Sequence, residues 1–276
     1  MESRNPAFRG NAFGQRAGGA GYGAPVYGAP GYGTQQQGGA GYPAPGYALP
    51  STRPMTMDDV VVRGFMTLVT LVLAAAAAWV LVPSGIAIPV LVVAFIAQLG
   101  IWAFITFGRK ANALTVLTFA AVYGVIVGIV SHAYNDLFHG VVFQAVIGTA
   151  LAFAATLAVY ALRIVRVTPK FAKFTMAAAV ALISLMIINL LMNMFGSEAG
   201  LGIRDPSNPL AYVFSVVAIL VGCFFLLLDF DSIEEGVRAG APEKFAWYCA
   251  FGLVLALVWI YLEMLRLLSY IYGGRD

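Results

Sequence analysis

The chain has 276 residues, of which 61% are hydrophobic and 11% charged, and its formal net charge is +3. Soluble domains rarely approach this composition. The lysines and arginines are spread along the chain, so we expect no nucleic-acid-binding surface, which would need them clustered on one face. The two cysteines, Cys223 and Cys249, lie inside apolar segments, which fits neither a disulfide framework nor a zinc site.

The N-terminal segment, residues 1–56, is rich in Gly, Pro, Tyr and Ala. Frequent Gly and Pro prevent a continuous helix, and few aliphatic residues are available for burial, so we predict a disordered tail. The segment has no apolar region of the kind that a secretory signal peptide needs. Its tyrosines recur every five residues at Tyr22, Tyr27 and Tyr32. The tail is either simply solvated or makes weak multivalent contacts through these rings, for example with other membrane proteins.

Residues 57–276 contain seven long apolar stretches. Each supplies the roughly 20 apolar residues that a helix needs to cross a bilayer. A lipid-exposed backbone must satisfy its own hydrogen bonds, and these stretches do not alternate as barrel strands would. The fold class is therefore an all-α membrane protein with seven transmembrane helices. The expected helices are 64–82, 86–107, 112–131, 141–164, 171–195, 210–230 and 245–271.

The basic residues in the connections predict the orientation of the bundle. With the N-terminus in the cytoplasm, 13 of the 16 lysines and arginines fall on the cytoplasmic side and 3 outside. Cytoplasmic connections carry the excess of Lys and Arg in membrane proteins. We therefore predict a cytoplasmic N-terminus and, after an odd number of spans, a C-terminus outside.

Two pairs of residues within the apolar stretches suggest contacts between helices. Gly124 and Gly128 form a GxxxG step, which allows a second helix to approach closely. Asn189 and Asn193 lie one turn apart on one face of the fifth helix. These amides either hydrogen-bond a neighbouring helix or line a polar pathway.

Acidic side chains on the last two helices are the candidate functional residues. Asp229 and Asp231 follow a run of leucines at the end of the sixth helix, and Glu263 lies within the seventh. Ionisable residues are costly in a bilayer and often mark ion pathways and proton relays. The structural alternatives are an ion pair between Glu263 and Arg266 within one helix, and a solvated helix end around Asp229.

Two short motifs carry a family resemblance. Asp229 is followed four residues later by Ile233, and the seventh helix holds an aromatic-leucine-acid pattern that ends at Glu263. In these motifs and in the number of spans, residues 57–273 resemble the Bax inhibitor-1 (TMBIM, YccA/YetJ-like) family, with Glu263 in place of the usual aspartate. The Gly/Pro/Tyr-rich tail resembles an actinobacterial type of extension.

The resemblance implies a pH-sensitive calcium leak channel in the bacterial plasma membrane. In bacterial relatives a carboxylate on the sixth helix and one on the seventh share a proton. Two carboxylates in contact at low dielectric cannot both ionise cheaply, and once ionised they offer oxygen ligands to a hard cation such as Ca²⁺. Carried over to this chain, the pair and possible metal ligands are Asp229 and Glu263. The further candidates are Asp231 as a second sensor and Arg266, Asn189 and Asn193 as supporting residues.

The spacing along the seventh helix bears on this pair. A straight helix that starts near Glu243 lifts Glu263 by about 30 Å, to the side of the bilayer opposite Asp229. Contact between Asp229 and Glu263 would require the seventh helix to start later in the sequence.

Two other classes of function are considered. One is a non-transporting regulator that acts through protein contacts, for example with a membrane AAA protease. The other is an intramembrane enzyme, but the sequence shows no HExxH pattern and no paired-aspartate protease motif. We therefore expect no enzymatic activity and no cofactor, apart from Ca²⁺ as a transported ion.

Overall fold

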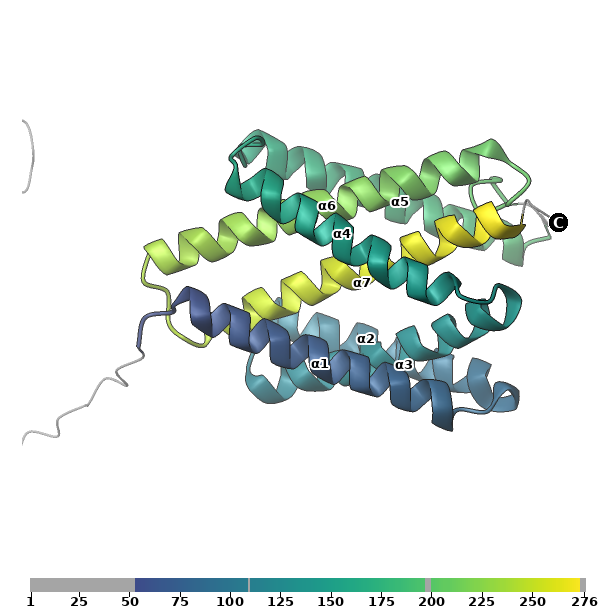
Figure 1. Ribbon diagram of the computed structural model, residues 1–276, viewed down its shortest axis with the longest axis horizontal. Coiled ribbons are helices and arrows are strands. Elements are labelled where there is room, and N and C mark those ends of the chain that lie inside the picture. Colours follow the sequence, from purple (N-terminus) through teal and green to yellow (C-terminus); the bar gives the residue numbers. More distant parts are fainter. Residues whose placement is uncertain (1–52, 109, 197–199, 274–276) are drawn as a thin grey trace, which may run out of the picture. The chain divides into compact units, whose positions relative to one another are not determined.

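Seven α-helices account for most of the residues that the computed structural model describes, which are 53–108, 110–196 and 200–273. Each of them is long and apolar enough to cross a membrane, which confirms the predicted fold class. Most of the predicted tail, residues 1–52, lies outside the described residues. The helices are α1 Met57–Leu81, α2 Ser84–Gly108, α3 Ala113–Leu137, α4 Val141–Ala161, α5 Pro169–Met194, α6 Pro209–Arg238 and α7 Phe245–Gly273 (Figure 1).

Three helices extend further than predicted, each through polar residues. α1 begins at Met57 rather than 64, α3 ends at Leu137 rather than 131, and α6 ends at Arg238 rather than 230. A helix can continue beyond the hydrocarbon because its backbone remains hydrogen-bonded. At the start of α1, the Thr56 N–H donates to Asp59 at 2.9 Å and the Asp59 N–H donates to the Thr56 hydroxyl at 3.3 Å. This capping box stabilises the added turn.

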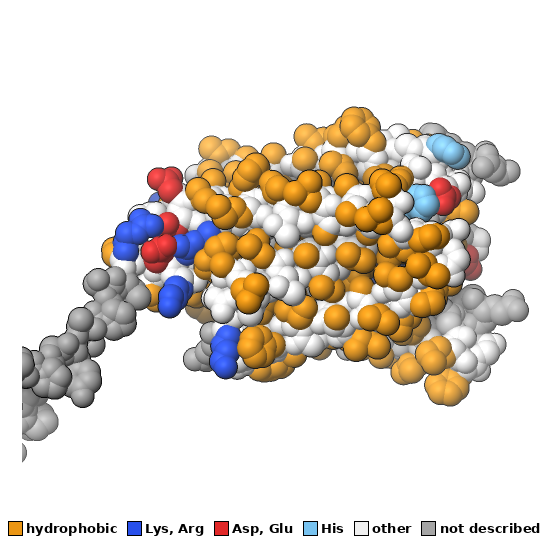
Figure 2. Space-filling view, turned by 90° about the horizontal axis from the view of Figure 1, so that it is seen from below, with side chains coloured by type: hydrophobic (Ala, Val, Ile, Leu, Met, Phe, Trp, Pro, Cys, Tyr) orange, Lys and Arg blue, Asp and Glu red, His pale blue; other side chains and the backbone are white. Residues whose placement is uncertain are grey.

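Helix α7 runs through the middle of the bundle, with α1, α2 and α3 on one side and α4, α5 and α6 on the other (Figure 1). It packs against α1, α3, α4 and α6. Among the described helices α2 packs only on α3 and α5 only on α6. The side of the bundle seen in Figure 2 is covered by apolar side chains, and most of the visible Lys, Arg, Asp and Glu gather at one end. This distribution suits a lipid-facing surface that ends at the headgroups.

Hydrogen bonds between helices fix the position of α7. The Trp259 indole N–H donates to the Ala218 carbonyl of α6 at 2.9 Å. The hydroxyls of Ser131 on α3 and Tyr261 on α7 share a hydrogen bond of 2.7 Å. Polar groups buried in an apolar medium need such partners, so these two bonds also fix the rotation of α7 about its axis.

The close approach predicted at Gly124 and Gly128 is present, and the helix that approaches is α1. An added Cβ at Gly124 would lie 2.3 Å from the Leu71 carbonyl oxygen, and one at Gly128 would lie 2.3 Å from the Ala75 carbonyl oxygen. Both distances are far below van der Waals contact, so only glycine lets the two backbones pack this closely.

We expect Gly128→Ala to destabilise the bundle by about 1–3 kcal/mol, because the added methyl group collides with main-chain atoms that cannot move aside. Gly100→Ala is the matched control, since a Cβ there would meet nothing within 4 Å. The control should be neutral or slightly stabilising, because Ala favours helix over Gly. Thermal unfolding in detergent measures both, and equal melting temperatures would contradict the packing role of Gly128.

The folded part of the chain begins before α1. The Met55 N–H donates to the Ala241 carbonyl at 2.8 Å and the Glu243 N–H donates to the Arg53 carbonyl at 3.0 Å. The Met55 side chain is only 2% exposed and packs against Gly236 of α6. Residues 53–56, which were predicted to belong to the tail, therefore form a strap on the turn between α6 and α7. Local composition could not indicate this, because the contacts are made with residues far along the chain.

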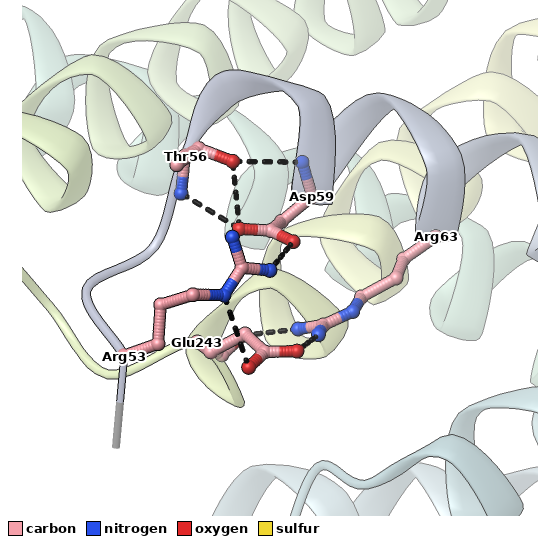
Figure 3. A network of polar contacts seen from close by, with 5 residues as sticks. All are labelled: Arg53, Thr56, Asp59, Arg63 and Glu243. Carbon is pink, nitrogen blue, oxygen red and sulfur yellow. Dashed lines mark hydrogen bonds and ion pairs between the residues drawn. The ribbon is translucent and has the colours of Figure 1, made fainter. Parts of the chain in front are cut away.

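Charged side chains fasten this strap (Figure 3). Arg53 pairs with Asp59 at 2.6 Å and with Glu243 at 3.6 Å. Arg63 of α1 also pairs with Glu243, and its guanidinium lies 5.4 Å from the centre of the Trp247 ring on α7. Two arginines and two acids balance one another, so the network joins the start of α1 to the start of α7 without a net charge.

Candidate functional site

Asp229 lies on α6, nine residues before the end of the helix, and its carboxyl group faces α7. An added Cβ on Gly252 of α7 would lie 2.7 Å from Oδ1 of Asp229. The carboxyl group therefore occupies space that a side chain on α7 would otherwise fill. The neighbouring Leu226, Phe230 and Ile233 are buried and apolar.

No hydrogen bond and no ion pair is made by Asp229 within the described parts of the chain. A charged carboxylate without a donor or a cation nearby is costly in apolar surroundings. Asp229 itself is partly exposed, so its charged form depends on water or a cation that reaches this position.

Asp231 lies in a different environment from Asp229. Residues two apart on a helix project to nearly opposite sides, and Asp231 lines an open hollow of about 400 Å³ at the end of α6. Glu234 and Arg238, which also line the hollow, pair with each other, and Glu234 accepts a hydrogen bond from Tyr160 of α4. The hollow is thus a polar surface at the helix end, separate from the contact between Asp229 and Gly252.

Glu263 is buried, with 4% of its surface exposed, and two arginines compensate its charge. Arg204, from the connection between α5 and α6, donates two hydrogen bonds to the carboxylate at 3.1 and 3.2 Å. Arg266 donates one at 2.7 Å. The ion pair within α7, one of the alternatives considered from the sequence, is present, but Arg204 makes it a group of three. We call Glu263, Arg204 and Arg266 the charge triad.

The connection between α5 and α6 is held in place around the triad. The Arg204 guanidinium lies 4.9 Å from the centre of the Phe214 ring, and the Arg204 carbonyl accepts from the Tyr270 hydroxyl at 3.5 Å. The Ser207 hydroxyl and backbone N–H donate to Asp205 at 2.7 and 3.0 Å. These bonds lower the pKa of Asp205, which keeps it charged beside Arg204.

The two asparagines of α5 also face this connection. Asn189 is buried and its side-chain oxygen accepts from the Leu201 N–H at 2.8 Å. An added Cβ at Gly200 would lie 2.9 Å from the side-chain oxygen of Asn193. Asn189 therefore binds the connection rather than a neighbouring helix, and both amides support the segment that carries Arg204.

Asp229 and Glu263 do not meet. Asp229 contacts Gly252, and Glu263 lies eleven residues further along α7, which separates the two levels by about 16 Å at 1.5 Å per residue. The late helix start that contact would require does not occur, since α7 begins at Phe245 and continues without interruption. Neither the shared-proton pair nor a common Ca²⁺ site is formed by these residues. Among the described residues no group of three His, Cys, Asp or Glu side chains is placed to hold a metal ion.

A sequence model of the family described as Bax inhibitor 1 like matches residues 5–273. The chain belongs to the Bax inhibitor 1-like family. This confirms the resemblance drawn from the two motifs, and the match also includes most of the tail, which the motifs had left outside it. None of the curated proteins matches the sequence significantly.

Two residues of this Bax inhibitor 1-like protein that shape the candidate site were not identified from the sequence. Arg204 had a signal, since a basic residue in a connection otherwise poor in Lys and Arg is unusual. No sequence signal pointed to Gly252, because glycine is common in membrane helices and the role of this one depends on its facing Asp229.

We expect Glu263→Gln to destabilise the protein by about 3–5 kcal/mol, because Arg204 and Arg266 would be left facing each other without a counter-charge. Adding Arg204→Gln should recover part of this loss, since removing both partners costs less than leaving a charge unpaired. Melting temperatures of the two single variants and the double variant in detergent test this. Additive losses would show that the two side chains do not act as a pair.

Proposed function

We propose that this Bax inhibitor 1-like protein is a pH-sensitive leak channel for cations, Ca²⁺ in particular, in the bacterial plasma membrane. The observation that carries the proposal is the carboxyl group of Asp229, which faces α7 among buried apolar residues without a hydrogen bond or ion pair in the described residues. Membership of the family supports it, because bacterial proteins that the chain resembles are described as pH-sensitive calcium leak channels.

Protonation of Asp229 is the proposed gate. The protonated group is neutral and can remain against Gly252, with α6 and α7 packed together. Loss of the proton places a full negative charge at the contact, where none of the described residues supplies a cation or a hydrogen-bond donor to compensate it. Water and a hard cation then supply the missing partners, and their entry separates the two helices locally. Conduction should therefore rise with pH, and one carboxyl group rather than a shared-proton pair is sufficient.

The charge triad takes a different part in this proposal. Its two guanidinium groups exceed the single carboxylate of Glu263 by one positive charge, which opposes the passage of a cation. We assign it to closure of the outer end, with the N-terminus in the cytoplasm. Opening for conduction then requires the α5–α6 connection, which carries Arg204, to move away from α7.

Calcium flux into dye-loaded liposomes tests the gate. The wild-type protein should conduct more at about pH 8 than at about pH 6, whereas Asp229→Asn should reduce the flux at the higher pH to the level at the lower one, because its side chain cannot ionise. Asp231→Asn is the matched control. It removes an acid from the same helix, but one that lines the open hollow, so the variant should keep the pH response. A pH response that survives in Asp229→Asn would refute the assignment.

The same experiment separates transport from the alternative function. If no variant and no pH gives flux, the protein is better described as a non-transporting regulator that acts through protein contacts. Deletion of the gene should then change the turnover of other membrane proteins.

A further inference from the structure

The connection between α4 and α5 carries a dense group of basic side chains. Arg163, Arg166, Lys170 and Lys173 fall within eleven residues, and no Asp or Glu occurs between Asp136 and Glu198. All four side chains are exposed. We call these four residues the basic surface.

Most of this positive charge is not neutralised by the protein. Arg166, Lys170 and Lys173 form no ion pair within the described residues, whereas Arg163 lies within electrostatic range of Glu234. Other arginines at the same end are engaged: Arg53, Arg63 and Arg238 each pair with a carboxylate. The N-terminus of α5 adds to the potential through the positive end of the helix dipole.

Arg163 occupies a backbone conformation that normally favours glycine. Its φ is 53°, and the end of α4 is closed by hydrogen bonds from the Arg163 N–H to Tyr160 at 2.9 Å and from the Ile164 N–H to Val159 at 3.1 Å. Helices that end in this way usually have glycine at the left-handed position. Here the chain keeps a basic side chain at a position where glycine would be less strained.

Apolar side chains lie between the basic ones and are also exposed. Leu162 is 71% exposed, Ile164 67% and Phe174 61%. Rings of Phe171 and Phe174 contact Phe224 of α6, which fixes the first turns of α5 on the bundle. Exposed apolar and basic side chains at the edge of a lipid-facing surface suit the boundary between headgroups and acyl chains. A soluble acidic protein would match the charges but not the exposed apolar groups.

We propose that the basic surface binds the headgroups of anionic phospholipids. The phosphate groups neutralise Arg166, Lys170 and Lys173, while Leu162 and Ile164 enter the upper part of the acyl region. Bound lipid then holds the connection and the start of α5, a helix that within the described residues packs on α6 alone.

Lipid-dependent thermal stability of the full-length protein in neutral detergent tests this proposal. Phosphatidylglycerol should raise the melting temperature, whereas phosphatidylcholine with the same acyl chains, or inorganic phosphate, should not. Lys170→Gln/Lys173→Gln should require about 30-fold more phosphatidylglycerol for the same effect, since each basic residue near a headgroup contributes about a fivefold gain in affinity.

The matched control is Lys110→Gln/Lys244→Gln, which removes two exposed lysines from other connections at the same end. It should respond to phosphatidylglycerol as the wild type does. An equal loss in both double variants would mean diffuse attraction between charges and would overturn the proposal. Equal stabilisation by phosphatidylcholine, or by phosphate alone, would overturn it as well.

Arg163→Gly separates the binding role from folding. Glycine relieves the left-handed backbone, so the variant should melt at a higher temperature than the wild type without lipid, yet gain less from phosphatidylglycerol. A full response to phosphatidylglycerol in this variant would show that Arg163 does not contribute to lipid binding.

Discussion

An uninterrupted α7 is the constraint on which the other features of this protein depend. In a bilayer the backbone has no water to bond with, so a spanning segment keeps its helical hydrogen bonds from one end to the other. The number of residues between two positions on such a helix therefore sets how far apart they lie in depth, at 1.5 Å per residue. Gly252 and Glu263 are therefore held at different levels, and Asp229, which faces the first, is kept from the second.

The two acids consequently have different chemical characters. Glu263 is bonded to two guanidinium groups, and these ion pairs join α7 to the α5–α6 connection. Asp229 faces a glycine and has no such partner in the described residues, so the proposed gating is assigned to this acid rather than to Glu263. A membrane protein that responds to protons needs an acid of the second kind.

Much of the fold could be predicted from the sequence because a bilayer imposes simple rules. Length and hydropathy were enough to locate seven helices, and the spacing of Gly124 and Gly128 identified a close helix contact, although not that α1 would be the partner. The ion pair of Glu263 with Arg266 followed from helical periodicity. Arg204 and the strap at residues 53–56 did not follow, since both depend on contacts between distant parts of the chain. Contact between Glu263 and Asp229 would need α7 to start later in the sequence. It does not, because α7 is helical without interruption from Phe245 onward.

The strap has a mechanical consequence. Its hydrogen bonds and ion pairs attach the chain at Arg53 to the turn that joins α6 to α7, and the same turn follows directly on α6, the helix that carries Asp229. Tension applied to the chain ahead of Arg53 would thus be transmitted to that turn before it reached the lipid-embedded part of α1. Residues 53–56 are coupled in this way to the two helices that come last in the sequence.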